Sequence, residues 1–193
     1  MKLTRISEIR RRELRRAAYE VLQTEGLAGT TLEKVAAHAG ASKGIVLHYF
    51  RNKQELFEQA MREANAELRI AVTERLKHAA SPRERVLAIV LGNFEPQFFR
   101  PSISHAWLSL CAEVPREPQL ARLQQVFHAR MNSNLVAALS ELVGREEARE
   151  IALGISALID GLWLRLGLGS SPLTREQALA QMQRYLDGVL PAA

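Results

Sequence analysis

The apolar residues of this chain recur at the spacing of an α-helix almost from end to end, and no segment shows the alternation of a half-buried strand. All seven prolines lie at or after Pro82, where they divide the pattern into separate segments. Ser81, followed by Pro82 and Glu84, is a strong signal for a helix start. Thr174 and Gln177 have the spacing of a capping box before the last segment. The pattern predicts an all-α fold of about nine helices.

The composition narrows the class of protein further. With 47% hydrophobic and 24% charged residues, the 193-residue chain is an ordinary globular one rather than a disordered one. Its one cysteine, Cys111, excludes an intramolecular disulfide and a cysteine-ligated zinc cluster. The basic N-terminus has no apolar segment behind it, and the most apolar stretch, 151–168, is interrupted by Asp160 and Arg165. We therefore expect a soluble cytoplasmic protein without a membrane segment.

Positive charge is concentrated near the N-terminus. Residues 1–60 contain 11 Lys/Arg and 7 Asp/Glu, a net charge of +4, whereas 61–193 contain 15 and 14, a net charge of +1. Much of the excess lies on the first predicted helix, which Gly26 is expected to end. Such a localised basic region is typical of a surface that binds a polyanion, although a solvated basic helix face has the same composition.

Two short helices should follow, joined by a glycine turn. Thr30 and Glu33 have the spacing of a capping box for the first, and Ser42 can cap the second, which is expected over 43–50. The turn between them contains Gly40. This is the arrangement of a helix-turn-helix, whose second helix enters the major groove of DNA. A helical hairpin with a basic surface is the alternative.

The residue types of the second short helix suit DNA recognition. Ile45, Val46 and Phe50 are expected to pack inward, and Lys43 and His48 can donate hydrogen bonds to bases on the other face. Other predicted residues contact thymine methyl groups or phosphates, and the backbone of a glycine is predicted to come close to the bases. The predicted DNA-contacting residues are Arg10, Arg11, Arg12, Thr31, Ser42, Lys43, Gly44, Leu47, His48, Tyr49 and Lys53.

Residues 30–56, from Thr30-Thr31-Leu32-Glu33 through Asn52-Lys53-Gln54-Glu55-Leu56, resemble the DNA-binding signature of TetR-type repressors. The resemblance implies an all-helical homodimer that binds a palindromic operator in double-stranded DNA. It implies a three-helix DNA-binding domain at 1–52 and a helical domain at 53–193. The second domain would hold a small-molecule effector and the dimer interface.

Four segments of the second half resemble the choline-responsive repressors of glycine-betaine synthesis genes. They are 92–94, 122–126, 133–136 and 157–165. The resemblance implies choline or a related organic cation as effector. A regulator of the same fold that responds to a hydrophobic or aromatic compound, of the multidrug type, is the alternative.

A cationic effector also has a physical rationale in the residue types. Quaternary ammonium groups are recognised by aromatic faces, with a carboxylate nearby to offset the charge. The predicted effector-binding residues are Phe94, Trp107, Glu113, Asp160 and Trp163. The alternative is that the aromatic residues are core and that Asp160 pairs with Arg165.

The helix that contains Asp160 is also a candidate for dimerisation. It is apolar almost all round, and small residues at helical spacing allow another helix to approach closely. Together with the last helix it could form a four-helix contact across a twofold axis. The predicted interface residues are Gly154, Ala157, Gly161, Leu179, Met182 and Leu186. Burial within one subunit is the alternative.

Catalysis is not expected. The chain contains no Gly-x-Ser-x-Gly, phosphate-binding loop or His-Glu-x-x-His, and its five histidines are scattered. We therefore predict no catalytic residues, no cofactor and no metal site. A non-specific architectural DNA binder is the remaining alternative outside the regulator class.

Overall fold

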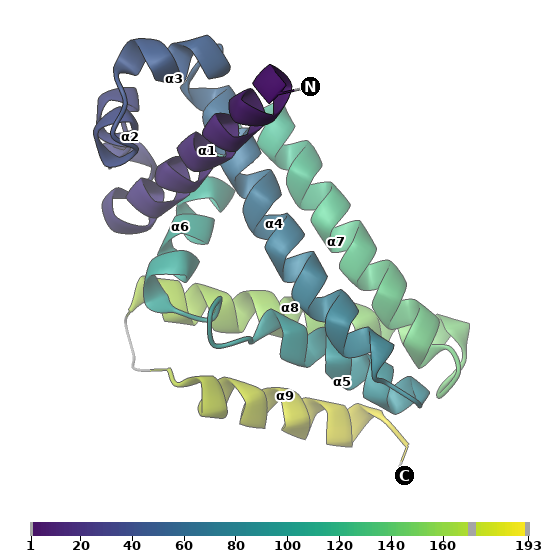
Figure 1. Ribbon diagram of the computed structural model, residues 1–193. Helices are drawn as coiled ribbons and strands as arrows, with labels where there is room; N and C mark the ends of the chain where they lie inside the picture. Colours follow the sequence, from purple (N-terminus) through teal and green to yellow (C-terminus); the bar gives the residue numbers. More distant parts are fainter. Residues whose placement is uncertain (1, 170–172, 192–193) are drawn as a thin grey trace. The chain divides into compact units, whose positions relative to one another are not determined.

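The computed structural model describes residues 2–169 and 173–191, which form nine α-helices and no strand (Figure 1). The all-α prediction is confirmed. The helices are α1 (Lys2–Gly29), α2 (Leu32–His38), α3 (Lys43–Tyr49), α4 (Lys53–Lys77), α5 (Pro82–Asn93), α6 (Pro101–Cys111), α7 (Pro118–Leu139), α8 (Arg145–Leu168) and α9 (Arg175–Val189).

The junction between α1 and α2 corrects one prediction. Regular helical geometry stops at Gly26 as predicted, with a φ of 65°, and a further helical segment runs to Gly29, where α1 ends. Thr30 does not cap α2, because its amide and its hydroxyl both donate to the carbonyl of Gly26, at 3.2 and 2.6 Å. Thr31 is the cap instead, and its hydroxyl accepts from Lys34 N at 3.2 Å.

A similar correction applies between α7 and α8. Gly144 predicts the end of the long helix that follows Pro118, but that helix, α7, ends at Leu139 and a turn follows. Gly144 is the N-cap of α8, with a φ of 86° that an L side chain rarely adopts. By contrast, Ser81 and Thr174 cap α5 and α9 as predicted, and Thr174 forms the reciprocal capping box with Gln177.

The chain divides into two compact units, which are described separately. The first contains Met1–Asn65 and His105–Leu123, and the second contains Ala66–Ser104 and Gln124–Ala193. The predicted domain boundary after residue 52 therefore falls inside the first unit, between α3 and α4.

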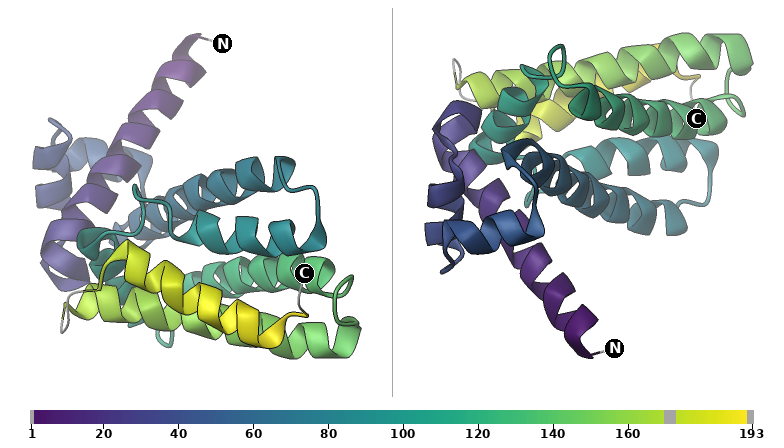
Figure 2. Two further views of the ribbon diagram at one scale, coloured as in Figure 1. Left: turned by 90° about the horizontal axis from the view of Figure 1, so that it is seen from below. Right: turned by 90° about the horizontal axis from the view of Figure 1, so that it is seen from above.

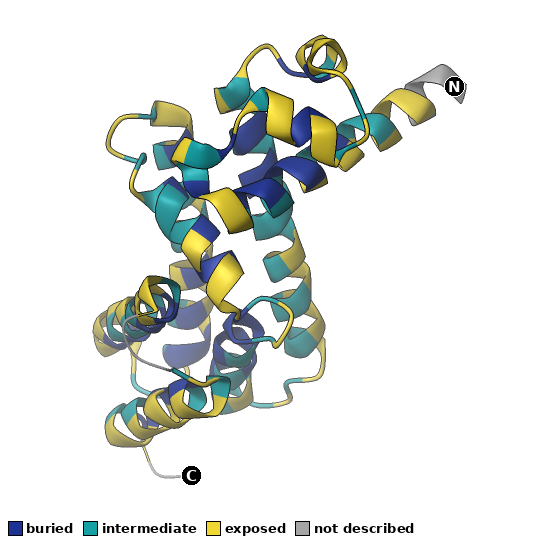
Figure 3. Cartoon of the chain, turned by 90° about the vertical axis from the view of Figure 1, so that its left-hand side faces the viewer, coloured by how far each residue is buried: buried dark blue, intermediate teal, exposed yellow. Residues whose placement is uncertain are grey.

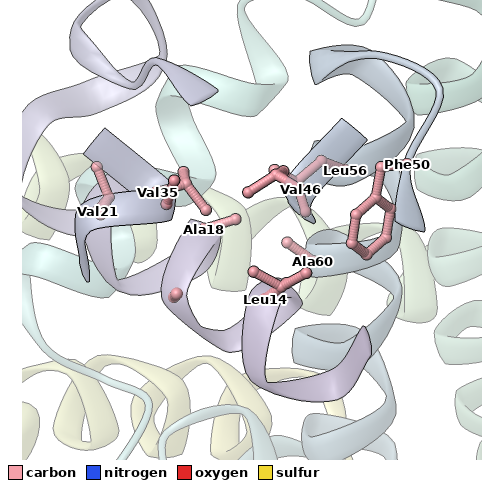
Figure 4. Packing of buried hydrophobic residues seen from close by; sticks show 10 residues of the cluster. Leu14, Ala18, Val21, Val35, Val46, Phe50, Leu56 and Ala60 are labelled. Atoms are coloured by element: carbon pink, nitrogen blue, oxygen red, sulfur yellow. The ribbon is translucent and has the colours of Figure 1, made fainter. Parts of the chain in front are cut away.

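The core of the first unit is built from one face of each of its N-terminal helices. Leu14 and Ala18 of α1 meet Val46 of α3 and Leu56 and Ala60 of α4 (Figure 4). Buried positions lie on one side of these helices and exposed positions on the other (Figure 3). A second cluster in the same unit brings α6 and the start of α7 against α1 and α4. It consists of Leu22, Phe57, Met61, Ala106, Leu110, Leu120 and Leu123.

In the second unit, α8 packs against both α5 and α9 (Figure 2). Gly154 makes the α8–α9 approach possible, since a Cβ there would lie 1.8 Å from the Oη of Tyr185. By length and composition alone α8 could cross a membrane, a property that core helices of soluble proteins share. Ile151, Ile155 and Ile159 are among the buried residues of α8, whereas Leu153, Leu164 and Leu168 on the same helix are exposed.

Candidate DNA-binding and effector-binding sites

The N-cap of α3 and the turn between α2 and α3 fix where the second of these helices begins. The hydroxyl of Ser42 accepts from Ile45 N at 3.3 Å and so starts α3 as predicted. Gly40 has a φ of 58°, and Ala41 N donates back to Ala36 O at 2.8 Å. These contacts fix two short helices as a helix-turn-helix.

One side of α3 anchors the helix and the other faces solvent. Val46 is 0% exposed and Phe50, which follows the helix, is 1% exposed. Leu47 is 43% exposed, and Gly44 and His48 are also on the surface. Ile45 is predicted to pack inward, but it is 40% exposed. Neighbouring residues of a helix point in different directions, and Val46 is the one that points into the core. The exposed face has the size and chemistry needed to enter the major groove.

Some predicted DNA-contacting side chains are engaged within the chain. Lys43 Nζ lies 2.6 Å from Glu33 Oε1 in an exposed ion pair, which exchanges readily with solvent. Lys53 Nζ donates to Leu27 O at 3.1 Å and lies 5.1 Å from the centroid of the Phe57 ring. Lys53 therefore ties the start of α4 to the end of α1.

The three predicted arginines differ in their surroundings. Arg10 pairs with Glu13 at 2.8 Å on the surface of α1. Arg11 lies over the ring of Phe50, 5.2 Å from its centroid, and 3.4 Å from Glu55. Arg12 is exposed. Phosphate contacts by these residues remain a prediction.

We expect a Gly44→Ala variant to separate folding from DNA binding. Among the described residues, the nearest atom to a Cβ at this position is the Ser42 Oγ at 3.7 Å, so thermal stability should be unchanged or slightly higher. If the backbone of α3 approaches the bases, the added methyl group should weaken DNA binding by on the order of 1–3 kcal/mol. Fluorescence anisotropy with labelled duplex DNA measures the change, and unaltered affinity would show that the helix does not approach closely at Gly44.

Two of the predicted effector-binding residues belong to an aromatic cluster in the second unit. The rings of Phe94 and Trp163 both contact Phe99 edge to face, with centroids 4.9 and 5.7 Å apart. Trp163 Nε1 donates to Asn93 O at 3.2 Å, and the Ser104 hydroxyl donates to Trp163 O. All of these side chains are buried. Phe99 and Asn93, which sequence reasoning missed, thus help to orient Trp163.

Asp160 pairs across helices rather than along its own. Its Oδ2 lies 3.3 Å from Nε2 of His128 on α7, whereas the predicted alternative partner is Arg165. The same ring nitrogen lies 3.1 Å from the amide nitrogen of Gln124. The hydrogen bond to Asp160 raises the pKa of His128 above its ordinary value of 6.5, against the opposing effect of partial burial. No local spacing could have indicated this pair, because its partners come from different helices.

The His128–Asp160 pair predicts a pH-dependent contribution to stability. A raised folded-state pKa stabilises the folded protein fully below the unfolded pKa of about 6.5, and this contribution is lost as pH rises through the folded value. Asp160→Asn should therefore lower the free energy of unfolding in acidic solution and change it little in alkaline solution. Urea unfolding at both pH values tests this, and equal losses at the two would contradict the assignment.

The other two predicted effector-binding residues lie in the first unit. Trp107 is half-buried on α6, and Glu113 follows that helix, 4.0 Å from Arg116. Glu113 lines a pocket of about 310 Å³ together with Phe57 and Leu120. The five predicted residues are thus divided between the two units, and the aromatic contacts described above join Phe94 and Trp163, through Phe99, in one cluster.

The predicted interface residues differ in how far they are buried within the single chain. Met182 and Leu186 are buried within the single chain, so they stabilise the packing of α9 rather than reach a second copy. Leu179 is half-buried, and the space beside Gly154 is filled by Tyr185. A Cβ added at Gly161 would meet no atom of the described residues within 4 Å. The exposed apolar residues on the same helix as Gly161 are Leu153, Ala157, Leu164 and Leu168, and the charged Arg165 is exposed among them.

Comparison with known families defines the class of protein. Residues 14–60 match the family described as bacterial regulatory proteins, tetR family, and residues 82–191 match the BetI-type transcriptional repressor C-terminal domain. The chain belongs to the TetR family of bacterial transcriptional regulators. It is 40% identical over 189 residues to the HTH-type transcriptional regulator BetI of Escherichia coli K12, with 96% of each chain covered. This family is not enzymatic.

Solved structures show the same fold. A putative transcriptional regulator from Pseudomonas aeruginosa PAO1 has a TM-score of 0.81 at 25% identity, covering 94% of this chain and 90% of that one. A TetR transcription regulator from Haloarcula marismortui has a TM-score of 0.86 at 17% identity, covering 95% and 100%. A putative transcriptional regulator from Saccharomonospora viridis, solved in complex with choline, has a TM-score of 0.80 at 18% identity, covering 95% and 98%.

Proposed function

We propose that this chain is a dimeric repressor that binds a palindromic operator and regulates genes for the conversion of choline to glycine betaine. The proposal names choline or a closely related organic cation as its effector. The observation that carries it is the 40% identity to BetI over 96% of both chains, which includes the BetI-type C-terminal match at 82–191. A repressor must reach the DNA that it regulates, and bacterial DNA lies in the cytoplasm, so we place the protein there.

The DNA-binding part of the proposal rests on α3. Its buried side is fixed by Val46 and Phe50, so its exposed side keeps a defined orientation. Lys43 and His48 supply donors for base acceptors, and Leu47 supplies an apolar contact for a thymine methyl group. We assign base reading to these three residues, close approach of the backbone to the bases to Gly44, and phosphate contacts to the other predicted residues.

The dimer would use the exposed side of α8. Leu153, Ala157, Leu164 and Leu168 recur at helical spacing on a helix whose other side packs on α5 and α9. The open space at Gly161 allows a second helix to come close. Two copies related by a twofold axis would present two recognition helices to a palindrome.

The cation-binding part rests on the second unit and on the choline complex of the Saccharomonospora viridis relative. Asp160 supplies negative charge one helical turn before Trp163, whose ring belongs to the Phe94–Phe99 cluster. An aromatic face and a carboxylate are what a quaternary ammonium requires. Trp107 and Glu113 of the first unit remain alternative contacts.

Calorimetry with two ligands of the same shape tests the effector class. Choline should bind, and its neutral carbon isostere 3,3-dimethylbutanol should bind much more weakly, because it lacks the charge that aromatic faces and a carboxylate attract. Equal affinities would mean that the site reads shape and apolarity alone. No choline binding at millimolar concentration would favour the hydrophobic-effector alternative.

A further inference from the structure

The carboxylate of Glu55, in the first turn of α4, holds two arginines from separate segments of the first unit. Its Oε2 accepts from the Arg51 backbone N–H at 2.9 Å and from Arg51 Nε at 3.1 Å. Its Oε1 accepts from Arg11 Nη2 at 3.4 Å. The Glu55 side chain is only 17% exposed, and these donors lower the pKa of its carboxyl group, the Arg51 backbone N–H most of all. Glu55 therefore links α1 to the segment between α3 and α4.

Local sequence explains why Glu55 occupies this place. Asn52 Oδ1 accepts from Glu55 N at 2.8 Å, which starts α4. A glutamate three residues after an N-cap can reach back across the first turn, and here it reaches Arg51. Arg11 is fixed independently by its position over the buried Phe50 ring. Both guanidinium groups are thus held beside the end of the helix that is proposed to enter the major groove.

The three charged side chains of this cluster together carry a positive charge, and Glu58, Glu113 and Glu117 line the same pocket as Arg51 and Glu55. Two guanidinium groups and one carboxylate leave a net positive charge. The Arg51 side chain is 89% exposed, and its Nε alone is engaged among the side-chain contacts described. A guanidinium has five N–H donors in a planar fork, and this fork matches the oxygens of a phosphate. Arg51 can therefore bind an anion without releasing Glu55.

We propose that Arg11, Glu55 and Arg51 form a clamp for a phosphodiester of the DNA backbone. In this clamp Arg51 contacts the phosphate directly, and Glu55 is a positioning residue that does not touch the DNA. Neither Arg51 nor Glu55 is among the DNA-contacting residues predicted from the sequence. The inference rests on the DNA-binding function of the family and on the contacts above.

If Glu55 positions the arginines, removing its carboxylate should change the affinity for DNA in the direction opposite to that expected from net charge. Removing a carboxylate makes the surface more positive, so charge alone would tighten binding to DNA. If Glu55 orients the two arginines, its loss should instead weaken binding. Gln at this position keeps an oxygen that accepts from the Arg51 backbone N–H, so the start of α4 should be preserved.

Glu58 provides a matched control. It lies on the same helix, is also 17% exposed, and pairs with Arg62 at 2.8 Å. Binding of full-length Glu55→Gln and Glu58→Gln to random-sequence duplex DNA can be measured by fluorescence anisotropy. We expect Glu55→Gln to weaken binding by about threefold, less than the loss of a whole charged contact because Arg51 itself remains, and Glu58→Gln to leave it equal or tighter.

The salt dependence of the same assay tests the direct contact. Arg51→Gln should lower the slope of log affinity against log salt by about one, whereas Arg62→Gln should leave it unchanged. An unchanged slope for Arg51→Gln would overturn the clamp. Binding by Glu55→Gln that is as tight as, or tighter than, binding by the wild-type protein would also overturn it. If Glu55→Gln fails to fold in a thermal scan, the Arg51 slope decides alone. Failure of the wild-type protein to bind any DNA would contradict the proposed function and the clamp together.

Discussion

Replacing Phe50 by alanine should cost about 3–5 kcal/mol of folding free energy and abolish DNA binding. The ring is 1% exposed and lies in the cluster that joins Leu14 of α1, Val46 of α3 and Leu56 of α4. Truncation would leave a cavity where three helices meet and would also remove the surface on which Arg11 lies. Denaturant unfolding, monitored together with binding to duplex DNA, measures both losses.

Ile45→Ala is the matched control for this prediction. Ile45 is an apolar residue of the same helix-turn-helix, but it is 40% exposed, so its truncation should change stability by no more than about 1 kcal/mol. A loss as large as that of Phe50→Ala would show that Ile45 is packed in the core and that the orientation of α3 is wrong.

Asp160→Asn should weaken choline binding more than tenfold. A partly desolvated ammonium loses its counter-charge in this variant, while the shape of the side chain is kept. Trp163→Leu should weaken it by a similar factor, since a desolvated cation–aromatic contact contributes about 2 kcal/mol, and Trp163→Phe should weaken it less. Calorimetry of the three variants gives the dissociation constants.

The neutral isostere distinguishes charge recognition from damage to the fold. Asp160→Asn should leave the weak binding of 3,3-dimethylbutanol unchanged, because that ligand has no charge to offset. Trp107→Leu and Glu113→Gln then decide between the candidate contacts of the two units. If choline affinity is intact in Asp160→Asn and Trp163→Leu but lost in these two, the effector site belongs to the first unit.

The helices were predictable because their signals are local. Ser81 and Thr174 cap α5 and α9 through residues three positions away, and such spacing is visible in a sequence. The errors also have local causes. Thr30 and Thr31 are adjacent candidates for one cap, and only the hydrogen bonds of Thr30 to Gly26 show that it belongs to the end of α1.

The site residues were less predictable because their partners are distant in sequence. His128 meets Asp160 across 32 positions, and Arg11 meets Glu55 across 44. Helical periodicity shows which residues share a face of one helix, but it does not show which helices meet. The burial of Met182 and Leu186 within one subunit, rather than between two, also depends on the packing of α9 on α8.

Selection of bound duplexes from a random pool, with the full-length protein, tests the central claim most directly. A dimeric TetR-family repressor should enrich a palindrome whose half-site centres lie about one helical turn apart or a small multiple of it. Choline should then change the affinity for that palindrome, and 3,3-dimethylbutanol at the same concentration should not. Enrichment of no symmetric sequence, or an affinity that choline leaves unchanged, would contradict the account.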